Sequence, residues 1–116
     1  MAIRKLFKTV HVNSDSEAGN SEFDLEYCLL EKEIVLDSFS VNTYGVEITK
    51  IYKNKDNTLC KEYRKVFDIF CTQSEAEAVL EKLARNTVTP VSLLDVLENM
   101  IGTGELVNEE ASFLAV

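Results

Sequence analysis

The sequence has few of the residues from which nucleotide and metal sites are commonly built. It holds four glycines, and neither GxxxxGK[ST] nor GxGxxG occurs, so a glycine-rich loop that cradles phosphate is not expected. It holds one histidine, His11, and three widely spaced cysteines without a CxxC pair. A structural zinc site usually takes about four such ligands, with close pairs among them. We therefore expect no metal and no cofactor.

Long apolar runs are also missing. The uninterrupted apolar stretches are only a few residues long, whereas a membrane-spanning helix needs about 20. The first segment, MAIRKLFKTV, interleaves basic and apolar side chains and lacks the separate apolar region and cleavage site of a signal peptide. The cysteines, Cys28, Cys60 and Cys71, are odd in number and fit reduced side chains. We predict a cytosolic protein that does not contact a membrane.

Positive charge is scarce as well. Twenty acidic residues against twelve basic ones give a net charge of −8, and such a field repels phosphate backbones at long range. The concentrated basic segment runs from Lys50 to Lys65 and includes Tyr52 and Tyr63, which suits weak binding of RNA or single strands by charge and stacking. Lysines on an exposed hairpin also block edge-to-edge pairing of strands. We favour this second interpretation and expect no DNA binding.

The sequence does contain enough apolar material for one domain. Its 116 residues are 46% hydrophobic and 28% charged, which is typical of a globular chain that builds a core without disulfides or metal. No linker or internal repeat divides it. We predict a single domain over residues 1–116, with its core in residues 22–102 and a C-terminal tail, residues 103–116, that is either frayed or docks on a surface.

Apolar and polar residues alternate with a period of two through the first part of the chain, as in half-buried strands. The clearest case is EFDLEYCLLE, in which alternate positions from Phe23 to Leu29 face one way and the acidic residues face the other. Asn13–Ser21 is polar and predicts a loop, and Asn54–Thr58 predicts a turn between the last two strands. The predicted strands lie near residues 3–12, 22–31, 44–53 and 59–71.

Gly45 and the segment Glu31–Thr43 lead to two further predictions for this region. Gly45 lies inside a strand, which indicates a bulge or the close approach of another backbone. Glu31–Thr43 has no clear period and reads as a connection. We expect its Ile-Val-Leu run, residues 34–36, to hold that connection against the core.

After the strands the apolar period changes to about 3.6, which is typical of helices. Ser74 and Glu77 have the spacing of a capping box, in which each side chain bonds the other residue's amide. We expect a helix over residues 75–85. Asn86 then follows it in the left-handed conformation that commonly ends helices.

A second helix is expected to begin with Thr89 as its N-cap and Pro90 at its first position, and to end near Ile101 with Gly102 after it. It holds no lysine or arginine, so it lacks the side chains with which a helix binds phosphates and base edges in a major groove. Its apolar residues spread over more than half of its circumference. Such a helix is buried in its own core or against a partner.

Four strands followed by two helices exclude a doubly wound parallel sheet, in which helices alternate with strands. We predict an α+β fold, with an antiparallel sheet of about four strands followed by two C-terminal helices packed on one face. By alternation, apolar side chains on the other face then need cover from a second copy or from the tail. These are Cys28, Leu30, Val66 and Phe70.

Three segments, FDLEYCLLE, YGVEITK and LARNTVTPVSLLDVLENMI, give the chain a family resemblance. The chain resembles a family of short uncharacterised proteins from clostridia and related Gram-positive bacteria, known as a domain of unknown function. The resemblance spans about Glu22 to Ile101, and VTPVSLLDVL is its most specific part. It implies a small bacterial cytosolic protein, without an assigned activity and without catalytic residues to transfer.

No set of residues in the sequence matches a catalytic pattern. His11 is the only histidine, and no local signature pairs it with a nucleophile. Glu22, Asp24 and Glu26 form a row on one strand face, which is more typical of a solvated surface than of carboxylates on opposite sides of a substrate. We predict that the chain is not an enzyme. A small enzyme or ligand binder with an acidic pocket near LEYCLLEKE is the alternative.

We therefore predict a non-enzymatic module that acts by protein–protein contact, as an interaction or regulatory protein. Its partner is another protein or a second copy of the chain in a homodimer. The predicted contact surface combines the second helix with the apolar end of the tail, which can dock on a partner. Its residues are Leu93, Val96, Leu97, Met100, Phe113 and Leu114.

Overall fold

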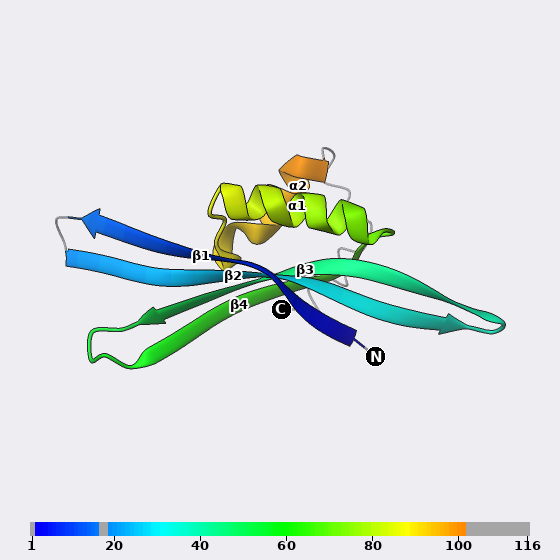
Figure 1. Cartoon of the computed structure of the whole chain (residues 1–116), viewed down its shortest axis with the longest axis horizontal. Coiled ribbons are helices and arrows are strands. Elements are labelled where there is room, and N and C mark those ends of the chain that lie inside the picture. Colours follow the sequence, from blue (N-terminus) through cyan, green and yellow to red (C-terminus); the bar gives the residue numbers. More distant parts are fainter. Residues whose placement is uncertain (1, 17–18, 102–116) are drawn as a thin grey trace.

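A computed structural model describes residues 2–16 and 19–101 of the chain (Figure 1). Four antiparallel strands form one sheet in the order β1-β2-β3-β4, so each strand pairs with the next along the chain, and two helices follow. This confirms the predicted α+β class. The elements are β1 (Ala2–Ser16), β2 (Gly19–Leu36), β3 (Phe39–Lys53), β4 (Leu59–Phe70), α1 (Gln73–Arg85), the 3-10 turn η1 (Pro90–Ser92) and α2 (Leu93–Ile101).

The first two hairpins are longer than the sequence pattern predicts, and the molecule measures 58 × 29 × 23 Å. β1 and β2 remain paired up to Ser16 and Gly19, so the predicted loop over Asn13–Ser21 is wrong. β2 and β3 remain paired up to Leu36 and Phe39, so Glu31–Thr43 is a hairpin rather than an irregular connection. Strand pairing is made by hydrogen bonds between main-chain groups, which polar residues also carry. The strands therefore stay paired in segments where apolar and polar side chains no longer alternate.

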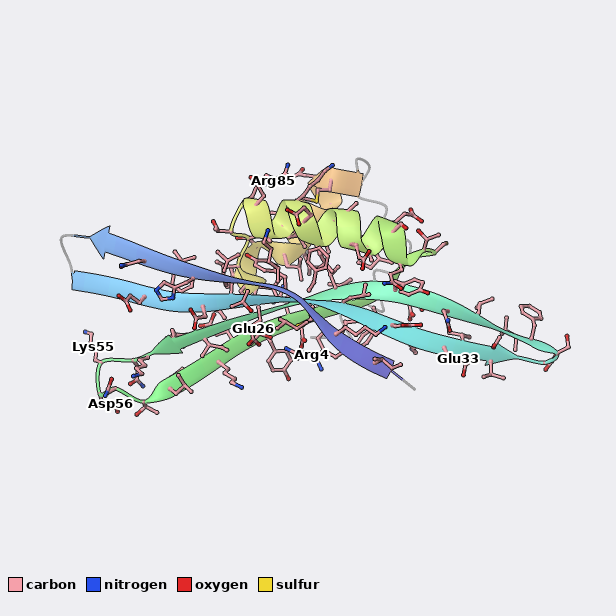
Figure 2. All side chains as sticks on the ribbon, in the orientation of Figure 1. Arg4, Glu26, Glu33, Lys55, Asp56 and Arg85 are labelled. Carbon is pink, nitrogen blue, oxygen red and sulfur yellow. The ribbon has the colours of Figure 1, made fainter. Side chains whose placement is uncertain are left out.

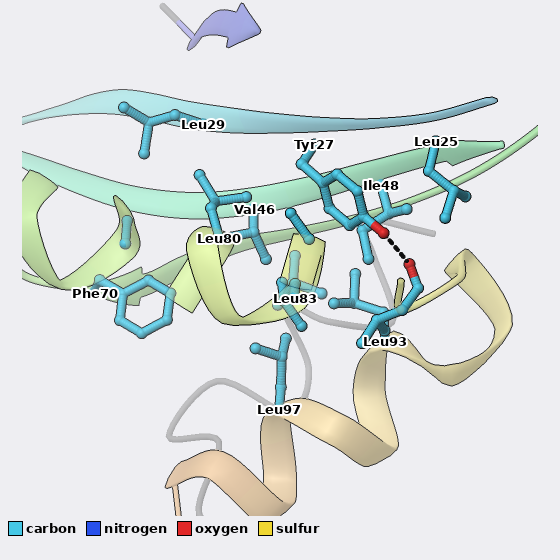
Figure 3. Close-up of a cluster of buried hydrophobic side chains, with 14 residues drawn as sticks. Leu25, Tyr27, Leu29, Val46, Ile48, Phe70, Leu80, Leu83, Leu93 and Leu97 are labelled. Atoms are coloured by element: carbon cyan, nitrogen blue, oxygen red, sulfur yellow. Dashed lines mark hydrogen bonds between the residues drawn. The ribbon is translucent and has the colours of Figure 1, made fainter. Parts of the chain in front are cut away.

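Both helices lie on the same face of the sheet, as predicted, and the core lies between the two layers (Figures 1 and 3). Alternation along β2 points Leu25, Tyr27 and Leu29 at the helices, where α1 presents Leu80 and Leu83. Full burial of one large apolar side chain stabilises the fold by roughly 1.5–3 kcal/mol. The buried cluster consists of Leu25, Tyr27, Leu29, Val46, Ile48, Val66, Phe70, Ala76, Leu80, Leu83, Ala84, Val88, Leu93 and Leu97.

A bulge in β4 lies opposite Gly45. Tyr44 pairs with Phe70, but Val46 pairs with Val66, so residues 67–69 all lie across from Gly45. The predicted bulge is confirmed. It places both Val66 and Phe70 in the core under the helices, which corrects their assignment to the opposite face. Simple alternation fails here because the extra residues shift which side chains point inward.

The first helix begins two residues earlier than predicted, at Gln73 rather than at residue 75. Thr72 is the N-cap, and its Oγ1 accepts the Glu75 amide at 3.2 Å while its hydroxyl donates to the Glu75 carboxylate at 3.0 Å. The capping pair is therefore Thr72 and Glu75 rather than Ser74 and Glu77. Both pairs have the same spacing, and Thr72 has the extended backbone, φ −130° and ψ 151°, that an N-cap requires.

The linker after α1 also differs in detail from the prediction. Asn86 has φ −96° and is not left-handed, whereas Thr87 has φ 49°. Thr89 and Pro90 do start the next helical segment, but its first turn is the 3-10 turn η1, and Thr89 makes no side-chain capping bond. Gly102, the predicted end residue, lies outside the described residues.

Candidate functional site

The predicted contact residues on α2 are divided between core and surface. Leu93 and Leu97 have no solvent exposure, while Val96 and Met100 are half-buried and pack against the core. The structure therefore assigns Leu93 and Leu97 to the core of the chain itself, because their side of α2 faces the other core residues (Figure 3). Two tail residues of the prediction lie outside the described residues: Phe113 and Leu114.

Several large apolar side chains that stay exposed lie instead at the far end of the β2–β3 hairpin. We call residues Glu33–Asn42 the arm. Val35 is 74% exposed and Phe39 58%, and Leu36 and Val41 are also exposed. The arm extends beyond the rest of the sheet, with the labelled Glu33 at its base (Figure 2). The Ile-Val-Leu run therefore does not hold this segment against the core, which corrects the prediction.

Pairing within the arm shows which of these side chains share a face. Ile34 pairs with Val41, and Leu36 pairs with Phe39. Paired residues point to the same side of a sheet, so these four form an apolar patch on one face, and Val35 lies on the other. The sequence held a signal for this hairpin, since two runs of β-branched and aromatic residues flank a polar pair.

The arm is paired only with itself in the described chain. Pairing between β1 and β2 starts at Lys32, and pairing between β3 and β4 ends at Tyr44. Within residues 2–16 and 19–101, no other strand pairs with the arm, so the main-chain groups along its outer edges are not used by the sheet. An isolated two-stranded ribbon is marginally stable in water, and exposed edges with apolar side chains are typical of contact surfaces.

The sheet face opposite the helices carries a buried carboxylate near its centre. Glu47 on β3 accepts a hydrogen bond from the Arg4 guanidinium, and its other oxygen lies 3.8 Å from the Lys65 ammonium. Arg4 also lies 3.5 Å from the Glu26 carboxylate (Figure 2). The hydrogen bond that Arg4 donates to Glu47 raises the pKa of Arg4. Two cations offset the desolvation of one carboxylate, so this cluster ties β1, β3 and β4 together.

Cys28 and Leu30 lie on this same face, as alternation predicts, and both are buried. Burial raises the pKa of the Cys28 thiol to about 11, against the opposing charge of Arg4. The thiolate is the reactive form of cysteine, so near neutral pH Cys28 acts as a small apolar side chain rather than as a nucleophile.

A cleft of about 460 Å³ opens at the end of the sheet opposite the arm, and its lining includes His11, Glu22 and Asp24. His11 Nδ1 lies 2.6 Å from Asp24 Oδ1. This hydrogen bond raises the pKa of His11 against desolvation, with further help from the Asp24 and Glu22 charges. The His11 side chain is 59% exposed. The described lining holds no serine, threonine or cysteine.

Aromatic rings of the basic hairpin lie against lysine side chains of the same chain. The Lys50 ammonium lies 4.6 Å from the centre of the Phe23 ring and 5.3 Å from that of Tyr52. The Lys65 ammonium lies 5.5 Å from the centre of the Tyr63 ring. Cation–π contacts of this kind already occupy one face of each ring. The arrangement therefore does not favour stacking of nucleic-acid bases on these rings.

Two further findings bear on ligands and environment. Among residues 2–16 and 19–101, no three His, Cys, Asp or Glu side chains lie close enough to hold a metal ion. Neither helix in that part of the chain has the length and apolar character needed to cross a bilayer.

Comparison with known proteins yields one match. The model of a family of unknown function (DUF6514) matches residues 7–103. This range reaches further toward the N-terminus than the resemblance expected from sequence, and it includes most of β1. No curated protein and no solved structure matches the chain. The family has no assigned activity, so it supplies no residue roles.

Proposed function

We propose that this chain, which belongs to the family of unknown function DUF6514, works by protein–protein contact without catalysis, and that it self-associates as a homodimer through the arm. The observation that supports this is the arm itself, a hairpin paired only internally in the described chain, with Val35 and Phe39 largely exposed. Large contiguous apolar patches on the surface of a soluble protein are typical of interaction sites.

The size of the arm sets the expected strength of contact. Each large apolar side chain that becomes fully buried contributes roughly 1.5–3 kcal/mol, whereas loss of free translation and rotation on binding costs several kcal/mol. A contact that buries only part of four or five such side chains from each copy therefore supports an association at the weak end of specific interfaces, with a dissociation constant on the order of micromolar or weaker. Contact would also stabilise a ribbon that is marginal by itself.

The absence of catalysis is supported by two observations on the described residues. The Cys28 thiol is buried and carries a raised pKa. His11 is exposed and is held by a carboxylate, and the cleft around it holds no hydroxyl or thiol of serine, threonine or cysteine. A nucleophile in contact with a base, which covalent catalysis requires, is not found in this part of the chain.

Analytical ultracentrifugation of the full chain and of Phe39→Asp tests the proposal. We expect the wild type to approach twice the chain mass at high concentration, and Phe39→Asp to remain a monomer because a charge in the patch opposes burial. Val91→Asp is the matched control, since Val91 is also 74% exposed but lies in η1, outside the arm. A wild type that stays monomeric up to about 1 mM, or equal effects of both variants, would overturn the proposal.

A ligand-binding role is the second candidate, and the cleft with Glu22, Asp24 and His11 favours it. Paired carboxylates beside apolar walls suit a cationic small molecule. Titration of the protein with a panel of small primary amines, followed by NMR chemical shifts, tests this role. Shifts confined to the cleft and lost in Asp24→Asn support it, whereas a panel that leaves the cleft signals in place excludes this ligand class.

We also infer a bacterial cytosolic setting. The family resemblance supports the bacterial origin. The three cysteines, all free, support a reducing compartment. Fractionation of the native host with an antibody to the chain checks this, and recovery in the membrane or secreted fraction would contradict it.

A further inference from the structure

The two edges of the arm differ in charge. On β2 the arm carries Glu33, and Asp37 follows at its turn. On β3 the arm residues Phe39–Asn42 and the next residue, Thr43, read FSVNT, without a charged residue, a proline or a bulge. No strand of the described chain pairs with the outer edge of this run, although the Thr43 hydroxyl donates to the Asp68 carboxylate of β4. Lysines, prolines and bulges are the devices by which natural edge strands avoid pairing with another strand. The β3 edge of the arm has none of them.

The long outer strands of the sheet are protected by contrast. β1 contains a bulge between Leu6 and Lys8. β4 contains the bulge opposite Gly45. Basic residues also lie on both strands: Arg4, Lys5 and Lys8 in the first half of β1, and Lys61, Arg64 and Lys65 on β4. The β3 edge of the arm therefore lacks the bulges and basic residues that protect β4 and the first half of β1.

We propose that Phe39–Thr43 pairs antiparallel with the same run of a second copy, about a two-fold axis at Val41. This inference rests on the self-association proposed above and specifies its geometry. The two arms then form one four-stranded antiparallel sheet, in which the free main-chain groups of each β3 edge find partners. Five residues span about 17 Å of strand, so the contact is small and matches a weak homodimer.

The register follows from the two-fold axis. Val41 faces Val41 of the second copy, and Ser40 faces Asn42 of the second copy. Because directly opposed residues share a face, the apolar patches of both arms become continuous. Their joint surface is made by two copies of Ile34, Leu36, Phe39 and Val41.

Charge favours edge pairing with a second copy over insertion of the arm into the cleft of a second copy. The chain carries a net charge of −8, so copies repel at long range, and the uncharged run on a projecting hairpin lets them meet where like charges do not face each other. A head-to-tail contact of the arm with the cleft of a second copy would bring Asp37 toward Glu22 and Asp24. Used in one direction, that contact is heterologous and produces rings or open chains of molecules rather than dimers.

A pair of double variants tests the register. Ser40→Lys with Asn42→Lys places lysine opposite lysine twice across the axis, whereas Ser40→Glu with Asn42→Lys places glutamate opposite lysine twice. The two variants differ only at position 40. Both should fold, because Asn42 pairs with Glu33 within the arm and Ser40 pairs with the exposed Val35. Circular dichroism verifies folding before each measurement.

Sedimentation equilibrium of the full chain is the readout. We expect the lysine–lysine variant to raise the dissociation constant of the dimer by about tenfold or more, and the glutamate–lysine variant to stay within about threefold of the wild type. Equal dissociation constants for the two variants overturn the edge pairing. If Phe39→Asp still abolishes the dimer in that case, self-association through the arm stands and only its geometry fails. A wild-type mass that grows beyond the dimer with concentration also overturns the two-fold arrangement, and a monomeric wild type overturns the self-association.

Discussion

The Tyr27 hydroxyl donates a hydrogen bond of 2.9 Å to the carbonyl oxygen of Val88, which joins the middle of β2 to the linker between the two helices (Figure 3). Tyr27 has no solvent exposure. The Val88 amide in turn donates to the Leu83 carbonyl at 3.0 Å, at the end of α1. One strand side chain therefore fixes the linker from which η1 and α2 follow, and both buried polar groups are satisfied.

Removal of this hydroxyl should destabilise the fold. We expect Tyr27→Phe to lower the free energy of unfolding by about 1–2 kcal/mol, because the Val88 carbonyl loses its partner while the packing of the ring is kept. Urea denaturation measures the change. Tyr63→Phe is the control, since Tyr63 is 57% exposed. Equal losses in the two variants would show that the buried bond is not the cause.

Alkaline pH should also destabilise the protein. Burial raises the pKa of Tyr27 from 10.0 to about 12 and that of Cys28 from 9.0 to about 11. The unfolded chain releases these protons at lower pH than the folded protein does. The stabilising contribution is therefore fully present below about pH 9 and is lost as the pH rises through the folded-state values.

Urea midpoints measured between about pH 8 and about pH 11 test this pH dependence. We expect a progressive fall over that range. Tyr27→Phe should show a shallower fall in the upper part, because the substituted ring no longer titrates. A constant midpoint for the wild type would contradict the prediction.

Gly45 should not tolerate a side chain. A β-carbon at this position would overlap the Val66 carbonyl oxygen and lie 2.9 Å from the Phe67 α-carbon. Both are backbone atoms of the β4 bulge, so they cannot rotate away. We expect Gly45→Ala to lower the free energy of unfolding by about 3 kcal/mol. Ser40→Ala, an exposed change in the same strand, is the control. A melting temperature of Gly45→Ala equal to that of the wild type would refute the close approach.

The cleft histidine should titrate above the ordinary value of 6.5, because Asp24 accepts its hydrogen bond and favours the protonated ring. An NMR titration of the single His11 signal measures the midpoint directly. We expect Asp24→Asn to lower it clearly, and Glu22→Gln to lower it less, since Glu22 acts by charge alone. A larger effect of Glu22→Gln would reverse this assignment.

Local patterns predicted much of the fold. The alternation from Phe23 to Leu29 identified the β2 face that packs under the helices, and Leu25, Tyr27 and Leu29 are indeed buried there. Gly45 was predicted to mark a bulge or a close approach, because a strand glycine has few other uses. The apolar stripe of α1 was readable for the same reason, since each of these signals lies within a few neighbouring residues.

The sites themselves were less predictable. Glu47 is buried against Arg4 and Lys65, which come from two other strands. A short stretch of sequence holds no signal for a contact between residues of different strands. The approach of His11 to Asp24 also depends on how β1 and β2 are aligned, and the polar turn between them does not determine that register.

The sequence by itself determined the order of elements, the α+β class and the apolar character of α2, because period and composition are local properties of the chain. The tertiary structure alone decided that Val66 and Phe70 lie on the helix side of the sheet, that Leu93 and Leu97 lie in the core, and that Val35 and Leu36 lie exposed on the arm. The physical reason is that burial depends on which strands continue alongside. β1 and β4 stop pairing at Lys32 and Tyr44, and the β2–β3 hairpin continues beyond them.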